Sequence, residues 1–145
     1  MASARDVAVH LQGMRDKAPE GCRAAVNAMG AVMVRATMLE LSRVSHLKGT
    51  PTPSAPGSPP AMIGGSLLRS VHATEPSGGG DQWQVTVGGS VVYARIHELG
   101  GQTGRGHKTR LPPRPYLRPA LEKIVADGSL RDKAVEVFRQ QVYGA

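Results

Sequence analysis

Apolar positions in the first third of the chain follow a helical period. Val7, Leu11 and Met14 lie four and three residues apart, as on one face of an amphipathic helix. The same spacing of four and three continues through Cys22, Val26, Met29, Met33 and Ala36. Three further apolar residues, Ala25, Val32 and Leu39, widen this stripe. We interpret these methionines as core residues and not as part of a cofactor site. The pattern predicts a helical segment over residues 1–48, in which Pro19 either kinks the helix or begins a second one.

Residues 49–61 break this period. Five prolines fall within residues 49–60, and proline removes backbone donors and fixes φ, so neither a helix nor a central strand can form there. We predict a linker or an extended arm, which at roughly 3 Å per residue is long enough to lie across a neighbouring subunit. A disordered surface loop is the alternative.

Residues 62–99 have mostly β character. Residues 70–74 suit a strand, and residues 82–87 alternate polar with apolar side chains. A loose turn is expected at 77–80, and Gly88-Gly89 permits a tight reversal after which residues 90–92 pair back. After Tyr93, the next positions of the pattern lie three, four and seven residues further on, which favours a short helix ended by Gly100 in a left-handed cap. A continuing strand is the alternative.

The remainder of the chain divides into a basic segment and a helical one. Residues 100–114 are rich in glycine and carry basic side chains, which predicts a mobile loop. Residues 115–145 are expected to be helical, with one helix over 117–126 that tolerates Pro119 in its first turn and a break at residues 127–128. Ser129 and Asp132 resemble a capping box for a last helix. The apolar side of that helix comprises Leu130, Ala134, Val137, Phe138 and either Gln141 or Val142.

Together these elements predict an α+β fold in one domain over residues 1–145. A long N-terminal helical segment, a small antiparallel β-sheet and C-terminal helices packed on it are expected. The core is thin, because the 145 residues include only one Trp, three Tyr and one Phe, and small apolar side chains bury little area each. We therefore expect the chain to gain burial from an obligate assembly.

The charge balance and the single cysteine limit the partners and the cellular compartment that suit the chain. A net charge of +7 attracts polyanions or acidic protein surfaces, without implying that a base sequence is read. Cys22 is the only cysteine, which excludes an internal disulfide and a thiolate metal cluster. The N-terminus reaches charged residues by Arg5, and we expect no membrane span, so the chain is predicted to be soluble and cytosolic.

Candidate catalytic motifs are incomplete. His97-Glu98 would need a second histidine one helical turn later to bind zinc, and Gly101 stands there. Gly64-Gly65-Ser66 would need a glycine two residues after the serine for a nucleophile elbow, and Leu68 stands there. No phosphate-binding loop is evident. We predict a protein that is not an enzyme and that holds no metal or cofactor.

Three segments carry a family resemblance by their order and spacing. They fit the patterns Gly-x-Leu-x-x-Ser, Tyr-Ala-x-x-x-Glu-x-Gly and Pro-Phe-Leu-x-Pro-Ala, and lie at residues 65–70, 93–100 and 115–120. Over about residues 20–125 the chain resembles the tail-completion family of long-tailed bacteriophages, described as gene-product-ten-like or related to lambda minor tail protein Z. Two departures are conservative: Tyr116 stands where the family often has Phe, and Leu99 where Phe is common.

The resemblance implies a structural virion protein of the phage neck, which completes the tail and helps to join it to the head. It implies a ring, sixfold by our expectation with twelve copies as the rival, in contact with connector or stopper, tail terminator and tail tube proteins. Before assembly the protein would lie in the host cytoplasm. Candidate subunit-interface residues are Leu67, Tyr93, Ile96, Glu98, Pro115, Tyr116, Leu117, Arg118 and Pro119. Packing of Tyr116 and Leu117 within the subunit is the alternative. Glu98 is expected to pair with Arg114 or Arg118, within or between subunits.

A nucleic-acid-binding protein is the main alternative. The net charge of +7 motivates this hypothesis, and the candidate contacts to channel DNA or to an acidic partner are Arg105, His107, Lys108, Arg110 and Arg114. In a neck ring the same side chains would face the packaged DNA, so the two hypotheses overlap. A small hydrolase is a third hypothesis, for which the sequence contains no complete motif.

Overall fold

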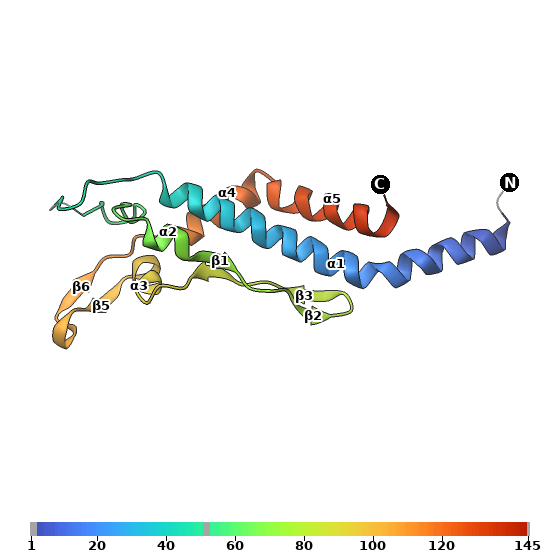
Figure 1. Cartoon of the computed structure of the whole chain (residues 1–145), viewed down its shortest axis with the longest axis horizontal. Coiled ribbons are helices and arrows are strands. Elements are labelled where there is room, and N and C mark those ends of the chain that lie inside the picture. Colours follow the sequence, from blue (N-terminus) through green and yellow to red (C-terminus); the bar gives the residue numbers. More distant parts are fainter. Residues whose placement is uncertain (1–2, 51–52, 145) are drawn as a thin grey trace.

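One long helix organises the molecule. The computed structural model describes residues 3–50 and 53–144, so two residues of the proline-rich segment, Pro51 and Thr52, lie outside the described part. Helix α1 spans Ala4–Leu41 without a break and contains Pro19. Figure 1 shows that its N-terminal part is bent relative to the rest, as expected when proline removes one hydrogen bond and crowds the preceding turn.

Both ends of α1 differ from the sequence-based expectation. A capping box that we did not predict begins the helix: the Ser3 hydroxyl accepts the Asp6 N–H at 3.2 Å, and the Asp6 carboxylate accepts the Ser3 N–H at 2.8 Å. The helix ends at Leu41 and does not continue to residue 48. Beyond it the chain is held by a bridge between Ser45 and Met62, which draws the backbone away from the helix axis.

The C-terminal helices pack on α1. Helix α4 spans Leu117–Ala126, as predicted, and α5 spans Ser129–Tyr143. Helix α5 makes its main contact with α1, and Figure 1 shows α5 above α1 with the strands on the other side. Gly21 permits the close approach, because a Cβ atom at this position would lie 2.8 Å from Cγ2 of Val142.

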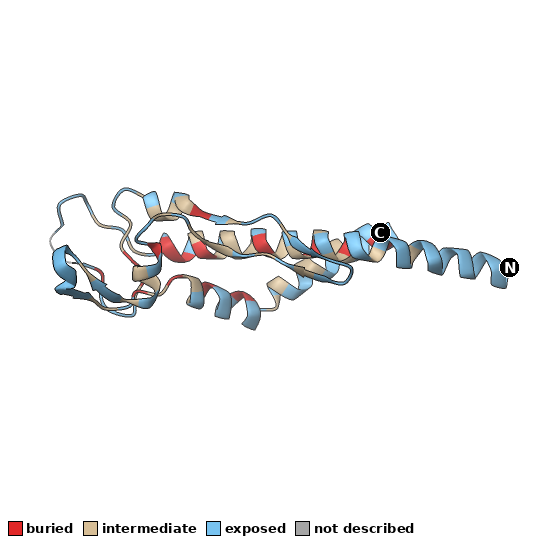
Figure 2. Ribbon diagram, turned by 90° about the horizontal axis from the view of Figure 1, so that it is seen from below, coloured by how far each residue is buried: buried red, intermediate tan, exposed pale blue. Residues whose placement is uncertain are grey.

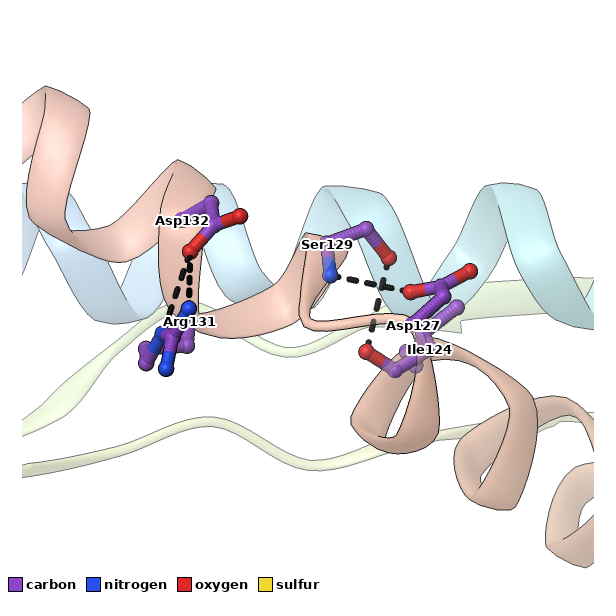
Figure 3. Close-up of polar contacts among 5 residues, drawn as sticks. All are labelled: Ile124, Asp127, Ser129, Arg131 and Asp132. Atoms are coloured by element: carbon purple, nitrogen blue, oxygen red, sulfur yellow. Dashed lines mark hydrogen bonds and ion pairs between the residues drawn. The ribbon is translucent and has the colours of Figure 1, made fainter.

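The predicted capping box at the start of α5 does not form. Gly128 is the N-cap in left-handed conformation, so Ser129 already lies within the first turn. Its N–H donates to the Asp127 carboxylate at 2.9 Å, and its hydroxyl donates back to the carbonyl of Ile124 at 3.4 Å (Figure 3). The carboxylate of Asp132 instead accepts the guanidinium of its neighbour Arg131 (Figure 3).

The strands form three separate antiparallel pairs. Strand β1, Val71–Ala73, pairs with β4, Val87–Gly89; β2, Ser77–Gly79, pairs with β3, Gln82–Gln84; and β5, Gly101–Thr103, pairs with β6, Thr109–Leu111. A short helix, α2, spans Ser66–Ser70 directly before β1. The predicted strand over 82–87 is therefore split, because its two ends pair with different strands.

The predicted reversal at Gly88-Gly89 is wrong. Both glycines lie within β4, opposite His72 and Val71, and residues 90–92 form no strand. Packing is the reason for glycine at the second position: a Cβ atom at Gly89 would lie 3.1 Å from the Cβ of Ala94. The turn expected at 77–80 is likewise mostly strand β2, and the reversal occurs after it.

The region after β4 contains the predicted short helix, α3, at Ala94–Leu99. Gly100 has φ 70° and ψ −177°, so it does not form the expected left-handed cap but leads directly into extended backbone. The segment predicted as a mobile loop is a β-hairpin, β5–β6, with a short 3₁₀ helix, η1, at Arg105–His107 in its connection.

The molecule is elongated, and its α+β class is confirmed. Leu41, Val71 and Tyr116 form the centre of the core, near one end of α1. Figure 2 shows buried residues from the middle of α1 to its C-terminal end, whereas its N-terminal end is exposed. The β5–β6 hairpin projects at the opposite end of the long axis (Figure 1).

Contrary to the expectation from the sequence, α1 is long and apolar enough to cross a membrane by length and composition alone. Helix α5 packs on α1, and this contact also accounts for the apolar side chains of α1. A helix in the core of a soluble protein meets the same criteria of length and composition.

Candidate functional site

The three segments of the resemblance meet in space around Tyr116. This side chain is only 1% exposed, and Leu67, Leu68 and Leu117 pack against its cluster. Its hydroxyl donates to the carbonyl of Ala94 at 3.4 Å. Burial, reinforced by the nearby charge of Glu98, raises the pKa of Tyr116 to about 12. We call this packed meeting point of residues 65–70, 93–100 and 114–121 the motif junction.

Glu98 closes the motif junction by capping helix α4. Its carboxylate accepts three backbone N–H groups, from Tyr116 at 2.7 Å, Leu117 at 2.9 Å and Arg118 at 3.1 Å. The first N–H groups of a helix have no partner within it and carry partial positive charge, which a carboxylate satisfies. The expected pairing with the side chain of Arg114 or Arg118 does not occur within the subunit, where Glu98 takes part in no ion pair among the described residues.

Arg114 links the motif junction to the proline-rich segment. Its side chain is buried, and Nε donates to the carbonyl of Ser54 at 3.0 Å. Its backbone N–H donates to the carbonyl of His97 at 2.7 Å, while the N–H of Gly57 donates to the carbonyl of Pro113 at 3.0 Å. The described part of the proline-rich segment is therefore fastened to its own subunit at two points.

His97 lies beside this link. Burial lowers its pKa, with a further contribution from the positive charge of Arg114. Its Nδ1 atom is buried without a hydrogen-bond partner, and its ring meets Tyr93 edge to face at 5.7 Å between centroids. The described residues contain no group of three or more histidine, cysteine or carboxylate side chains placed to hold a metal.

A cavity of about 390 Å³ lies between the proline-rich segment and α2. Its walls include Ser54, Met62, Leu67, Tyr93 and His97. The lining is mainly apolar, and it includes His97, whose buried Nδ1 atom has no hydrogen-bond partner in the described part of the chain. The cavity separates the proline-rich segment from the motif junction.

Of the nine candidate interface residues, only Tyr116 is fully buried within the subunit. Tyr116 is buried, Glu98 caps α4, and Leu67 and Leu117 contact the core. Partly buried positions are Ile96, Pro115 and Pro119, whereas Tyr93 and Arg118 remain exposed. The capping role of Glu98 has no local sign in the sequence, because its three partners lie 18 to 20 residues later.

The candidate DNA contacts are divided between two places. Arg105, His107, Lys108 and Arg110 are exposed on the β5–β6 hairpin, and none of them enters an ion pair in the described part of the chain. Arg114 lies apart from them in the interior, bound to Ser54. The four exposed residues define what we call the basic hairpin.

Residues 3–131 match the phage virion morphogenesis family, and this range covers the motif junction, the basic hairpin and all of α1. The chain belongs to this family. Its assignment to a phage virion family agrees with the resemblance seen in the three segments.

Among curated proteins, the chain is similar to Mu-like prophage FluMu G protein 2 of Haemophilus influenzae. The two are 47% identical over 34 residues, which is 23% of this chain and 25% of that protein. The match therefore spans about a quarter of the relative's length. No solved structure matches the chain.

Proposed function

We propose that this phage virion protein is a tail-completion or neck component that forms a ring at the head-tail junction. The observation that carries the proposal is the motif junction: the three segments that resemble tail-completion proteins pack around Tyr116 as one unit. Membership of the phage virion morphogenesis family supports a place in the particle. The proposed ring has six copies, with twelve as the rival, and its neighbours are connector or stopper, tail terminator and tail tube proteins.

The proposed role is structural and not catalytic. The polar groups at the motif junction serve the fold: Glu98 caps a helix, Arg114 holds a loop, and the Tyr116 hydroxyl bonds a carbonyl. Groups committed in this way are poor candidates for proton transfer, which needs access to a substrate. The two projecting ends of the molecule, the basic hairpin and the N-terminal part of α1, are exposed and free of these structural contacts.

The basic hairpin suits a contact with packaged DNA or with an acidic neighbouring protein. Arg105, Lys108 and Arg110 lie exposed on one hairpin, and such cations release counterions when they meet phosphates. The same observation supports the second candidate function, nucleic-acid binding without assembly. Contacts of this kind would be independent of base sequence.

Deletion of the gene in the producing phage tests the neck proposal. The expected result is an accumulation of filled heads and separate tails, with infectivity restored when the protein is supplied in trans. Mass spectrometry of purified virions should detect the protein, and electron microscopy should place it at the neck. Normal, infectious particles from the deletion strain, or absence of the protein from virions, would refute the proposal.

A salt titration of DNA binding tests the role of the hairpin. Replacing Arg105, Lys108 and Arg110 with Gln should reduce the slope of log K against log salt concentration by about 0.9 for each phosphate that is no longer neutralised, or by roughly 2 to 3 in all. A matched control replaces three exposed cations elsewhere, Lys48, Lys123 and Arg139. Equal reductions in both variants would mean that only net charge matters. Tight binding at physiological salt by a monomer would favour the second candidate function.

A further inference from the structure

The N-terminal end of α1 extends past the end of α5. Figures 1 and 2 show this overhang, which we define as residues 4–17. The first buried residue of α1 is Gly21. Before it, Val7 is 49% exposed and Leu11 57% exposed. At about 1.5 Å per residue the overhang is roughly 20 Å long.

The overhang presents an apolar stripe on the face that α5 covers further along. Val7, Leu11, Met14 and Ala18 lie four, three and four residues apart, and Gly21 continues the same spacing. Gly21 packs on Phe138 and Val142 of α5. Since helical neighbours at this spacing share one face, the stripe is a direct continuation of the α1–α5 interface.

The cover of this face stops where α5 stops. Helix α5 ends at Tyr143, which is itself 53% exposed beside the base of the overhang. A helix of this length is marginal in water without packing of its apolar face. The chain nevertheless begins it with a complete capping box at Ser3 and Asp6, so the overhang is a defined helix with an uncovered seam.

We propose that the overhang pairs with the overhang of a second copy of this chain, antiparallel and with Leu11 near the twofold axis. Heptad spacing on one helix is matched by the same spacing on its copy. In a parallel pair, the α5 helices of both copies, and the folded parts around them, would compete for the same space beside the paired helices. The antiparallel pair places the bodies at opposite ends, and each tip lies beside the exposed end of the other copy's α5.

Charges beside the stripe favour the same orientation. At about 100° per residue, Asp6 and Lys17 both lie roughly a quarter turn from Val7, on the same flank of the helix. In an antiparallel pair each flank of one helix faces the same flank of the other helix. Asp6, near the N-terminal end of one overhang, therefore meets Lys17, near the C-terminal end of the other. Opposite charges at such flanking positions set orientation and partner choice. His10, on the same flank between them, faces its own copy near the axis.

This pairing does not rest on the proposed neck function. It is an isologous contact, in which the same patch serves both copies, whereas closing a ring requires heterologous contacts elsewhere on the surface. The two can coexist, with overhang pairs joining subunits of one ring or of two. Failure of the phage experiment would leave the pairing intact, and failure of the pairing would leave the neck role intact.

The mass of the purified protein in solution, measured by analytical ultracentrifugation, tests the pairing. The wild-type chain should sediment as a dimer or an even multiple at concentrations on the order of 100 μM, within the range where weak isologous contacts form. Leu11→Asp should halve that mass or weaken association at least tenfold. Val9→Asp is the matched control, because Val9 is 63% exposed and lies on the opposite face of the overhang. Circular dichroism checks that both variants keep the helical body, which lies beyond the overhang.

Cysteine crosslinking tests the geometry. In a Cys22→Ala background, Leu11→Cys should form a disulfide-linked dimer on mild oxidation, and Val9→Cys should not. A wild-type monomer, or equal effects of the Leu11 and Val9 substitutions, would overturn the proposal. Loss of association in Leu11→Asp without crosslinking of Leu11→Cys would also overturn the antiparallel pair, since it would indicate docking of the overhang on a different surface.

Discussion

The carboxylate of Glu98 accepts the backbone N–H of Tyr116 at 2.7 Å, and this contact fixes where helix α4 begins. The same carboxylate accepts the next two N–H groups of the helix. Two of the three segments that suggested a phage protein are thus joined by one side chain. The third, at Leu67 and Leu68, completes the apolar surroundings of Tyr116.

Removal of this cap should destabilise the protein. Glu98→Ala leaves three N–H groups of α4 without their acceptor, and we expect a loss of about 2 to 3 kcal/mol in the free energy of unfolding. Glu98→Gln keeps one acceptor oxygen and should lose less. Urea denaturation followed by circular dichroism measures both. Unchanged stability in the alanine variant would show that water replaces the carboxylate at no cost.

Alkaline pH should destabilise the fold through Tyr116. Its pKa is raised to about 12 in the folded chain, against about 10 in the unfolded chain. Between these values the unfolded state releases the phenolic proton and the folded state retains it, so stability falls as pH rises from about 10 to about 12. The loss approaches roughly 2 to 3 kcal/mol at the upper end of this range.

Thermal unfolding as a function of pH measures this effect, with Tyr116→Phe as the control. The phenylalanine variant should be less stable at neutral pH by about 1 kcal/mol, because the carbonyl of Ala94 loses its donor. It should also lack most of the decline at alkaline pH. A decline of the same size in both proteins would assign the alkaline transition to other groups.

Two glycines of α1 should respond in opposite ways to substitution by alanine. A Cβ atom at Gly21 would meet Val142 at 2.8 Å, so Gly21→Ala should separate α1 from α5 and cost about 1 to 3 kcal/mol. Gly13 has no neighbouring atom within 4 Å in the described part of the chain, so Gly13→Ala should stabilise the exposed helix by up to about 1 kcal/mol. Chemical denaturation of both variants makes the comparison. Stabilisation by both would indicate that α5 can move without cost.

Arg114 should control the order of the proline-rich segment. Arg114→Lys removes the Nε donor to Ser54 and leaves a buried ammonium in its place. We expect faster hydrogen exchange at Gly57, whose N–H bonds to the adjacent Pro113, and earlier proteolytic cleavage within residues 53–60. Arg118→Lys is the control, because Arg118 is exposed and bonds to Glu98 through its backbone. Equal exchange in the two variants would contradict this role of Arg114.

Local patterns along the chain were enough to predict helices α1, α3, α4 and α5 and the class of fold, whereas helix α2 was not predicted. The apolar period over α1, the helix at 117–126 and the apolar side of α5 all follow from neighbours three and four residues apart, and these are local interactions that a pattern records. The three spaced segments likewise sufficed to indicate a phage protein, which the family match confirms at the level of virion morphogenesis.

Contacts between distant residues set the pairing of β1 with β4, the cap of α4 and the exposure of the overhang, and no local pattern predicts them. Gly88 and Gly89 have the composition of a turn, yet they lie in a strand because β1 pairs with them and α3 packs closely against Gly89. Glu98 caps a helix that begins 19 residues later, and Gly128, not the predicted Ser129, is the N-cap of α5. The apolar stripe of α1 has one spacing throughout, but α5 covers it only from about Gly21 onward. The stripe alone does not show where this cover ends, because that depends on the length of α5.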